Sequence, residues 1–490
     1  MPIDGLGEFV DILEKEGELR RISAEVDADL EVAEILRRVS YGLGNGERDG
    51  GPAILFENVR GHEMPILGNA FGSVRRMEIA LGTADYTEIG RRIADMSKIK
   101  IPSGLLGKIK SLPELSKMAG AFPKEPAESG PVSETVPKDA GFDSMPVLRS
   151  WPHDAGRFIT FGMVATRHPE TGVRNLGVYR MQIIDGSRCI IHWQKHKRGA
   201  AHGDISKEAG QKIPAAIIIG GEPATVFSAV APVPEGMDKY LFAGIARGGE
   251  GIRTVKCRTI DLDVPANAEI VIEGHVDPTE LEDEGPFGDH TGYYTPIEKY
   301  PVFTMTGMMT RKNPIYLATV VGRPVLEDAY IGKAIERSFL PLIQMFHPEV
   351  VDFAMPPAGW FQGLAIASIA KRYPGQAKKV MMGLWSMGQL ALTKMIIVVD
   401  ADIDVHDMEQ VIWAVTTRAD AAHDTTIIRD APTDTLDPAA RILNLGSKLG
   451  IDATQKTAAE GYMREVQRPV EADDATKRTV RKRWKEYGLP

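Results

Sequence analysis

The sequence predicts a multidomain protein of the α+β type, with an α/β domain at each end and a β-rich domain between them. Three observations support this prediction. The chain has 490 residues, whereas a single hydrophobic core seldom grows beyond about 250–300 residues. Apolar residues near the N-terminus recur at helical spacing, and after a segment rich in Pro, Glu and Ser they recur in strand-like runs. Beyond about residue 330, helical and strand patterns alternate again.

Residues 1–125 are predicted to form a small α/β domain. Leu6, Phe9, Val10 and Leu13 lie three and four residues apart, which is the apolar stripe of an amphipathic helix. The stretch EVAEILRRVS repeats this pattern, and PAILFENV predicts a strand. The following stretch FPKEPAESGPVSETVPKD has no periodic apolar face, so we expect a linker at about 120–145.

Residues 126–330 are predicted to form the β-rich domain. The stretch ITFGMVATRHPETGVRNLGVYRMQIIDGSRCIIHW holds two turn signals, PETG and DGS, between runs of β-branched and aromatic residues. AEIVIEGHV and YPVFTMTGMMT continue this pattern, and KIPAAIIIGGEPATVFSAV predicts a buried strand followed by a helix. Successive hairpins of this kind predict an antiparallel barrel or a sandwich.

Residues 331–490 are predicted to form a second α/β domain. The strand KMIIVVD, an acidic turn and the helix HDMEQVIWAVTTR follow one another, an order typical of parallel α/β units. The tail TKRTVRKRWKEYG is preceded by the acids of EADDA. Acids at the start of a helix and bases at its end complement the helix dipole, so we expect a solvated terminal helix.

Composition excludes several classes of protein. No apolar run approaches the roughly 20 residues of a membrane-spanning helix, and MPIDGLGEFV lacks the pattern of a signal peptide. The two cysteines, Cys189 and Cys257, argue against a disulfide framework and fit a reducing cytoplasm. A net charge of −9 argues against a general nucleic-acid binder. GxGxxG after a strand, GxxxxGK[ST], GxSxG and HExxH are all absent, which removes the main support for Rossmann, P-loop, α/β-hydrolase and zincin interpretations.

The stretch EGPFGDHTGYY, residues 284–294, is the strongest candidate for catalysis. Glu284 and Asp289 enclose a Gly-Pro-Phe-Gly turn, and His290 follows. Pro286 lacks an N–H donor and the glycines disfavour regular structure, so we expect a tight turn that fixes the direction of both acids. Rigidly held acids suit proton transfer. The alternative interpretation is a turn whose acids cap nearby amide groups.

Two further stretches of the β-rich domain carry polar residues of interest. RNLGVYRMQ places Asn175 and Arg180 five residues apart on a predicted strand. Odd spacing directs side chains to opposite faces, although Gly177 permits a bulge that re-aims one of them. HWQKHKRGAAH offers three histidines with basic residues between them, which suits a divalent metal beside a phosphate, or alternatively a polar hairpin edge. These histidines are His192, His196 and His202.

Seven separated motifs together resemble the UbiD-like family of prenylated-FMN-dependent decarboxylases. These motifs are NLGVYRMQ, HWQKHKRG, ANAEIVIEG, EGPFGDHTGYY, KKVMMGLW, VIWAVTTR and GSKLGIDAT. The resemblance runs from near the N-terminus to about residue 460. It implies an N-terminal α/β domain, a central split β-barrel that binds the flavin, and a C-terminal α/β oligomerisation domain that forms dimers and sometimes hexamers.

The resemblance also implies a reaction. Members of this family remove CO2 reversibly and without oxidation from aromatic or α,β-unsaturated carboxylic acids, through a covalent adduct with prenylated FMN (prFMN). A separate flavin prenyltransferase supplies the cofactor. By motif position, Arg180 matches the catalytic arginine, Glu284 the first catalytic acid and Asp289 the acid that donates the proton. His290, beside that acid, is expected to set its protonation or to contact the substrate.

A metal site is implied in the same way. Asn175 and His196 match ligands of a divalent cation, typically manganese, that bridges to the flavin phosphate, and a potassium ion is a further expectation. The residues predicted to bind the cofactor are Asn175, Gly177, Arg180, His196, Lys197, Lys239 and Lys394. For Lys394, just before the strand MIIVVD, an ion pair at the strand end is an equal alternative.

One position departs from the family pattern. Where we expect a glutamate as third metal ligand, PEGMDKYLFAG has Lys239. A cation in this place removes an anionic ligand, and we expect its ammonium group to pair with the phosphate directly. Glu222, Glu235 and Asp238 are possible substitute ligands.

Two other functions remain open from the sequence. The first is an FMN-dependent oxidoreductase on a split barrel, a class that has no need of Arg180, Glu284 and Asp289. The second is a non-catalytic flavin-binding subunit of a decarboxylase complex, against which the presence of all three residues argues. The candidate substrates are a quinone precursor, a simple aromatic acid or a phosphorylated enoate.

Overall fold

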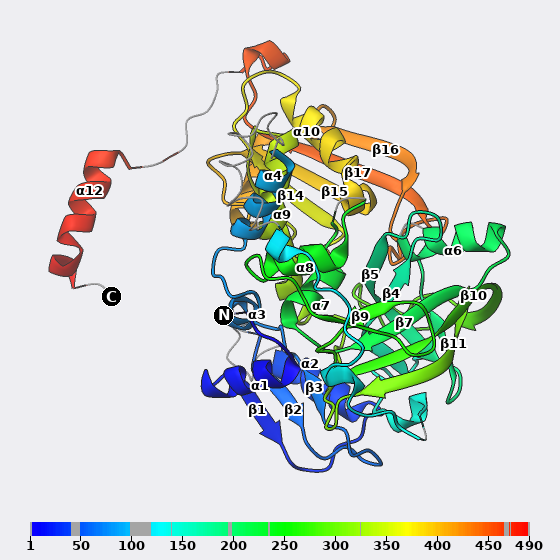
Figure 1. Cartoon of the computed structure of the whole chain (residues 1–490). Helices are drawn as coiled ribbons and strands as arrows, with labels where there is room; N and C mark the ends of the chain where they lie inside the picture. Colours follow the sequence, from blue (N-terminus) through cyan, green and yellow to red (C-terminus); the bar gives the residue numbers. More distant parts are fainter. Residues whose placement is uncertain are drawn as a thin grey trace, which may run out of the picture.

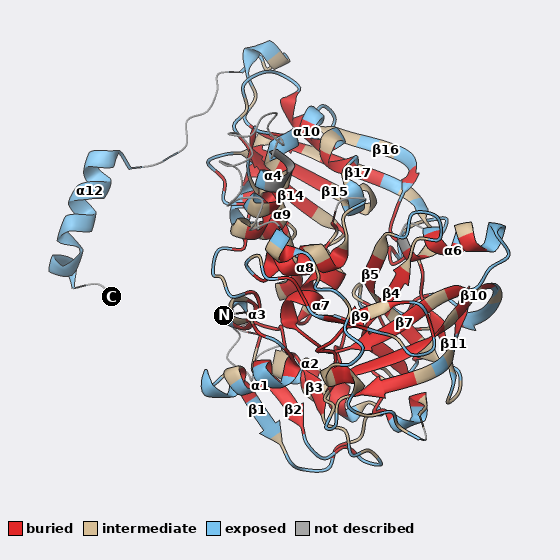
Figure 2. Ribbon diagram, viewed as in Figure 1, coloured by how far each residue is buried: buried red, intermediate tan, exposed pale blue. Residues whose placement is uncertain are grey.

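The structure is a computed structural model that describes residues 2–40, 50–98, 119–138, 140–194, 198–233, 236–323, 325–464, 470 and 472–488. Figure 1 shows three parts, with the N-terminal sheet at the bottom, the barrel at the right and the C-terminal sheet at the top. Helices α7 (Pro223–Val230) and α8 (Lys239–Ala246) lie between these parts. Figure 2 shows that these helices and the strands of the sheets hold much of the buried surface.

The N-terminal part is a four-stranded sheet covered by helices, as its patterns predict. Its elements are α1 (Leu6–Lys15), β1 (Leu19–Ile22), α2 (Glu31–Ser40), β2 (Ala53–Phe56), β3 (Ile66–Gly68), α3 (Val74–Leu81) and α4 (Thr87–Lys98). The predicted stripe of α1 is buried along its whole length. The sheet has the order β1-β2-β3-β12, and its last strand, β12 (Tyr316–Leu317), comes from the far side of the barrel. The end of the central region is thereby joined to the first domain.

The central part is a closed antiparallel barrel, so the barrel interpretation is confirmed over the sandwich. Its strands are β4 (Phe158–Arg167), β5 (Arg174–Ile183), β6 (Arg188–Ile191), β7 (Ile213–Ile219), β10 (Ile270–Glu284) and β11 (Glu298–Thr310). They close in the order β10-β11-β6-β5-β4-β7, with β10 also paired to β7. The inserted elements are α6 (Arg198–Glu208), α7, α8, β8 (Thr254–Lys256) and β9 (Asp263–Pro265). The turn 284–294 leaves the end of β10.

The expected linker at about 120–145 is instead packed against the barrel. It holds the short 3-10 helices η1 (Pro131–Ser133) and η2 (Phe142–Ser144), and Val132 and Phe142 are fully buried. The N–H of Ala127 donates to the carbonyl of Thr254 at 2.9 Å. The linker prediction was wrong because pairing of the backbone with a neighbouring strand needs no periodic apolar pattern.

The C-terminal part is a five-stranded sheet with helices on both faces. Its elements are α9 (Asp328–Phe346), β13 (Val350–Ala354), η3 (Pro357–Gly359), β14 (Leu364–Ile369), α10 (Gln376–Trp385), η4 (Gly388–Leu392), β15 (Met395–Asp400), α11 (Met408–Arg418), β16 (Thr425–Pro432), β17 (Leu445–Ala453) and η5 (Ala458–Glu460). The order is β13-β14-β15-β17-β16, with parallel pairs in the centre. The predicted strand and helix are β15 and α11, which confirms the parallel α/β unit.

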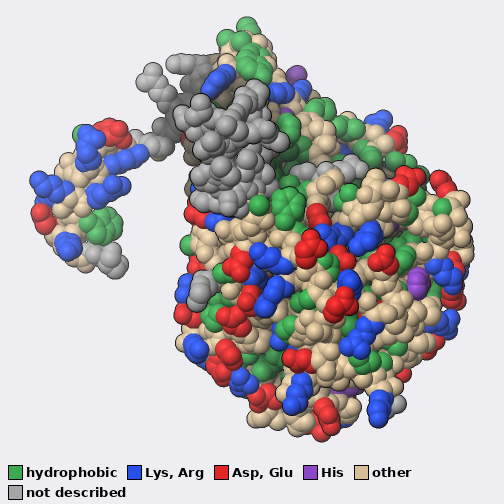
Figure 3. Space-filling model, in the orientation of Figure 1, with side chains coloured by type: hydrophobic (Ala, Val, Ile, Leu, Met, Phe, Trp, Pro, Cys, Tyr) green, Lys and Arg blue, Asp and Glu red, His purple; other side chains and the backbone are tan. Residues whose placement is uncertain are grey.

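The terminal helix α12 (Asp474–Arg483) stands apart from the rest of the protein in Figure 1 and continues into η6 (Trp484–Tyr487). All of its residues are exposed. Asp473 caps its start and Arg481, Lys482 and Arg483 lie in its last turn, and Figure 3 shows basic side chains along it. The predicted solvated helix is confirmed. In the described part of the chain, no helix combines the length and the apolar character needed to cross a membrane.

Helix α9 connects the C-terminal part to the first domain. It packs against α4, and a Cβ on Gly90 of α4 would lie 1.9 Å from the carbonyl oxygen of Ser338 in α9. Glu327, which precedes α9, accepts a hydrogen bond from the N–H of Phe71 at 3.1 Å. The first turn of α9 is therefore held in place by the N-terminal domain.

We expect the start of α11 to depend on a single side-chain cap. Asp407 accepts hydrogen bonds from the N–H groups of Glu409 and Gln410 at 2.9 and 3.3 Å. Asp407→Ala removes the side-chain acceptor of both donors and should lower the urea midpoint of unfolding. Asp407→Asn keeps an acceptor, so its urea midpoint should stay close to that of the parent. Equal losses in the two variants would contradict the capping role.

Candidate active site

Arg180 joins the two acids of the 284–294 turn in one buried cluster. Its Nε and Nη2 donate to the two carboxylate oxygens of Glu284 at 2.6 and 2.8 Å. Its Nη1 donates to Oδ2 of Asp289 at 2.5 Å. The three side chains are at most 7% exposed. One guanidinium is thus shared between two carboxylates that come from a segment more than a hundred residues away in the sequence.

Aromatic packing fixes the position of the Arg180 guanidinium. Its central carbon lies 4.8 Å from the ring centroid of Phe287, in the middle of the turn. That ring packs in turn on Phe158 at 4.6 Å, at the start of β4. The side-chain oxygen of Thr295 accepts from Nη2 of Arg180 at 3.2 Å and from the N–H of Phe287 at 3.3 Å. The plane of the arginine is therefore set by the same turn that carries its acids.

The backbone of the turn is as tight as its composition predicts. Gly285 has a φ of 92°, a conformation that favours glycine, and its N–H donates to Oε1 of Gln182 in β5 at 2.8 Å. A Cβ on Gly288 would lie 2.3 Å from the ring of Trp151. The N–H of Gly292 donates to the carbonyl of Asp289 at 2.8 Å. These contacts hold both acids on a rigid loop.

Asp154 anchors this loop to the segment before the barrel, and sequence reasoning missed it. Its carboxylate accepts hydrogen bonds from the N–H groups of Gly288, Ser150 and Trp151 at 2.8, 3.1 and 2.9 Å. Asp154 stands in the stretch WPHDAG, where neither periodicity nor a known motif marks it. Only the folded chain brings it beside the 284–294 turn.

His192 lies in this cluster and not in a metal site. Its Nδ1 is 3.1 Å from Oε2 of Glu284, and its ring packs against Tyr300 at 4.3 Å. Burial and the nearby Arg180 lower the pKa of His192, which favours a neutral ring. His202, the third histidine of that stretch, lies 3.0 Å from the hydroxyl of Thr166 through its Nδ1.

His290 links the turn to the C-terminal domain. Its Nδ1 lies 2.5 Å from a carboxylate oxygen of Asp328, in the first turn of α9, and its Nε2 lies 3.7 Å from Oδ1 of Asp289. Phe361 covers the ring edge at 5.4 Å. Burial lowers the pKa of His290, but Asp328, Asp289 and the more distant Asp434 outweigh burial and raise this pKa to about 9. His290 is therefore a cation at neutral pH. The adjacency of His290 to Asp289 is visible in the sequence, whereas the part played by Asp328 is not.

Both acids are ionised in this arrangement. Burial raises the pKa of Glu284, but Arg180 and the hydrogen bond from His192 outweigh it and lower the pKa to about 2. Burial acts on Asp289 in the same direction, and the positive charges of His290 and Arg180 again leave its pKa below the ordinary value. The two anions, Glu284 and Asp289, thus lie against two cations, Arg180 and a protonated His290.

The predicted cofactor residues of β5 lie beside the barrel interior. Asn175 is 4% exposed, and its amide nitrogen has no hydrogen-bond partner among the described residues. Gly177 leaves no room for a side chain, since a Cβ there would lie 2.6 Å from the ring of Tyr179. The expected bulge at Gly177 is absent, because β5 pairs regularly with β4 from Arg174 to Tyr179. The irregularity lies in β4 instead, between residues 159 and 162, opposite Arg180.

The predicted lysines differ in their surroundings. Lys394 forms an ion pair with Asp437 at 3.0 Å, the alternative that the sequence left open. Lys239 is buried, and its ammonium group donates to main-chain carbonyl oxygens at the end of α7.

His196, Lys197 and Glu235 lie outside the described residues. In the described parts of the chain, no three His, Cys, Asp or Glu residues are grouped so that they could hold a metal ion.

Three models of one protein family match this chain in the same order as the three parts of its structure. Family models for 3-octaprenyl-4-hydroxybenzoate carboxy-lyase (UbiD) match residues 10–96 with its N-terminal domain, 124–324 with its Rift-related domain and 329–453 with its C-terminal domain. A protein of Archaeoglobus fulgidus described as uncharacterized is 48% identical over 487 residues, 99% of each chain.

Two solved structures share the whole fold. Vanillic acid decarboxylase of Sedimentibacter hydroxybenzoicus in its closed form superposes with a TM-score of 0.87 at 29% identity, covering 100% of both chains. An evolved dimeric form of the UbiD-class enzyme HmfF from Pelotomaculum thermopropionicum, in complex with prFMN, superposes with a TM-score of 0.74 at 27% identity, covering 96% of this chain and 99% of that one.

The ion pair between His290 and Asp328 makes a testable contribution to stability. The pKa of His290 is raised from 6.5 to about 9 in the folded state. The resulting stabilisation, on the order of 3 kcal/mol, is fully present below pH 6.5 and is lost as pH rises through 9. The urea midpoint should therefore fall between pH 6.5 and pH 9.5, and Asp328→Asn should flatten this decline. An unchanged decline in that variant would contradict the assignment.

Proposed function

The chain belongs to the UbiD family of carboxy-lyases, and from this premise we propose that it is a prFMN-dependent decarboxylase. Its substrate is an aromatic or α,β-unsaturated carboxylic acid, from which it removes CO2 reversibly and without oxidation. One observation carries the assignment to this chain: a buried guanidinium is shared between Glu284 and Asp289 on a rigid turn. An FMN oxidoreductase has no need of such a cluster.

The residues present fit a flavin phosphate near the start of β5. The buried amide nitrogen of Asn175 has no acceptor among the described residues, and phosphate oxygens are acceptors. Bound there, prFMN would supply an electrophilic group that takes up the electron pair left when CO2 departs. Asn175 would hold the phosphate end, and the Arg180 cluster would face the reacting carbon.

Arg180 is proposed to bind the substrate carboxylate. Its Nη1 donates to Asp289, and an incoming carboxylate would compete for the same N–H. When the substrate takes this hydrogen bond, Asp289 loses a positive charge that lowers its pKa. Substrate binding thereby raises the affinity of Asp289 for a proton. Glu284, with a pKa of about 2, stays ionised throughout and keeps Arg180 in place.

Asp289 is proposed to deliver the proton that replaces CO2. His290 is protonated at neutral pH, and its Nε2 lies 3.7 Å from Oδ1 of Asp289. His290 can therefore transfer a proton to Asp289, which passes it to the substrate carbon. The side chain of His290 is 20% exposed, so solvent can restore its proton after each turnover. In the carboxylation direction the same groups act in reverse as bases.

The remaining expectations accompany this proposal. A flavin prenyltransferase is the expected source of prFMN, a homodimer or hexamer is the expected assembly, and the cytoplasm is the expected location. The substrate is proposed at the level of its class, because the Arg180 cluster recognises a carboxylate and leaves the rest of the molecule open.

Co-expression with a flavin prenyltransferase tests the proposal. The purified protein should carry the modified flavin, and it should release CO2 from at least one member of a panel of aromatic and α,β-unsaturated acids, detected in a coupled CO2 assay. The matched preparation made without the prenyltransferase should be inactive. Turnover with reduced nicotinamide and no CO2 release would instead support the oxidoreductase.

Asp289→Asn tests the proton donor. Asparagine keeps the shape of the side chain but cannot act as an acid, so turnover should fall by at least about 10²–10⁴-fold, the usual contribution of a general acid. The flavin absorbance of the purified variant should be unchanged. Asp283→Asn is the matched control, since Asp283 lies at the end of β10, next to Glu284, but is exposed and paired with Lys299. Full activity of Asp289→Asn would refute the assignment.

A further inference from the structure

We propose that Lys239 is a built-in cation, whose ammonium group takes the place of a bound metal or potassium ion at the cofactor site. This inference rests on the proposed flavin site. It predicts that this chain binds its cofactor without manganese and without potassium. The evidence is the carbonyl cage around the ammonium group, the ion pair that joins the starts of α8 and β5, and the other hydrogen bonds of two acids that the sequence suggests as ligands.

The ammonium group of Lys239 lies in a cage of main-chain oxygens. It donates to the carbonyl oxygens of Ser228 and Ala229 at 2.9 and 3.3 Å, and also to that of Ala231. Ser228 and Ala229 lie in the last turn of α7 and Ala231 directly follows this helix, where carbonyl groups lack helical partners and carry partial negative charge. Lys239 itself is only 6% exposed.

Such a cage is an environment for a monovalent cation. Rings of carbonyl oxygens replace the hydration shell of potassium in ion-binding sites. A lysine ammonium carries the same single charge in compact form and offers three donors to the same oxygens. Because Lys239 is covalently held, the positive charge is present whether or not salt is bound.

An ion pair joins the segment that carries Lys239 to the segment that carries Asn175. Arg174, the residue before Asn175, pairs through its Nε with Asp238, the residue before Lys239, at 2.9 Å. The guanidinium of Arg174 also lies 4.9 Å from the ring of Tyr240, the residue after Lys239. The starts of β5 and α8 are therefore joined where the sequence predicts the metal ligands.

Two of the three acids that the sequence suggests as substitute ligands, Glu222 and Asp238, have other partners in the structure. Glu222 is fully buried and accepts from Asn267 and Thr225 at 3.0 and 3.1 Å. Asp238 caps α8 through the N–H of Tyr240 and pairs with Arg174. With a lysine in the place of the expected carboxylate, a divalent ion would meet a positive charge instead of a ligand. The described residues do not fit a divalent metal.

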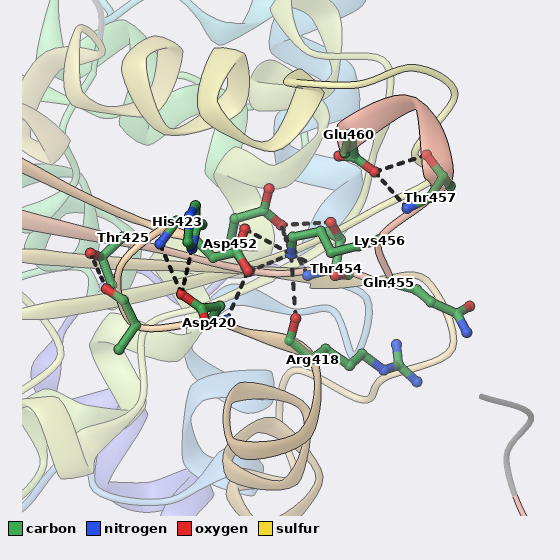
Figure 4. Close-up of polar contacts among 12 residues, drawn as sticks. Arg418, Asp420, His423, Thr425, Asp452, Thr454, Gln455, Lys456, Thr457 and Glu460 are labelled. Carbon is green, nitrogen blue, oxygen red and sulfur yellow. Dashed lines mark hydrogen bonds and ion pairs between the residues drawn. The ribbon is translucent and has the colours of Figure 1, made fainter. Parts of the chain in front are cut away.

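Lys456 shows what a purely structural ammonium of this kind looks like (Figure 4). It donates to the carbonyl oxygens of Asp452 and Thr454, both at 2.8 Å, at the end of the C-terminal sheet. Carboxylates accompany these carbonyls, with Asp452 at 3.3 Å and Asp424 at 3.5 Å. Lys456 is remote in sequence from the predicted cofactor residues and provides the matched control.

The wild-type protein provides the first test. Full-length protein from cells grown with MnCl2 is exchanged into sodium buffer, its metal content is measured by mass spectrometry, and FMN binding is titrated. We expect far less than one manganese ion per chain. The affinity for FMN should change less than about twofold on adding MnCl2, KCl or EDTA. One manganese per chain, or a roughly tenfold loss of FMN affinity after chelation or potassium removal, would overturn the proposal.

Variants provide the second test. Lys239→Ala empties the cage, so KCl and NH4Cl, but not choline chloride, should raise its thermal midpoint and its affinity for FMN. Lys239→Glu restores the expected ligand and should make FMN binding respond to MnCl2 by about tenfold. Lys456→Ala should lose stability without gaining either response. Responses of Lys239→Ala no larger than those of Lys456→Ala would refute the proposal.

These readouts stand apart from the proposed reaction. Metal content and FMN binding are measured without turnover, so an absence of CO2 release would count against the decarboxylase alone. Should both Lys239 variants fail to fold, the metal content and the salt response of the wild-type protein decide the question.

Discussion

The sharing of one buried guanidinium between two carboxylates is the constraint on which the site depends. Arg180, Glu284 and Asp289 are almost fully removed from water, and a buried charge without a partner is costly. None of the three can leave the cluster unless another charge takes its place. A carboxylate is such a charge, so an acid that binds beside Arg180 could rearrange the cluster. The rigid backbone around Gly285 and Gly288 limits this rearrangement to side chains.

The start of α9 extends this constraint to the whole molecule. Glu327 accepts from the backbone of Phe71 in the N-terminal domain, and the next residue, Asp328, pairs with His290 on the 284–294 turn. Two consecutive acids thus connect all three parts of the chain. Because His290 owes its raised pKa to Asp328, the positive charge beside Asp289 depends on how the C-terminal domain packs against the turn. The site is assembled by tertiary packing and not by the barrel alone.

Among the described residues of both sites, side chains of the protein itself supply the positive charges. Arg180 and His290 balance the acids of the turn, and Lys239 supplies a positive charge at the end of α7. Fixed charges of this kind need no reorganisation during a reaction, which is the basis of electrostatic preorganisation. A tethered ammonium has a further consequence, since it makes the local charge independent of the supply of metal ions.

The sequence by itself determined the three-part architecture, the helices and strands with clear periodicity, and the tight turn with Glu284, Asp289 and His290. These features are local, because a run of about ten residues already carries the apolar period or the turn chemistry. The resemblance already implied that Arg180 acts with those acids, and the structure shows the contacts. Tertiary structure alone decided that Asp154 and Asp328 support them, and that the expected linker lies packed on the barrel. Tertiary structure also placed the irregular strand pairing in β4, between residues 159 and 162, and not at Gly177 in β5. Such contacts join residues far apart in the chain, and their spacing in sequence carries no record of their distance in space.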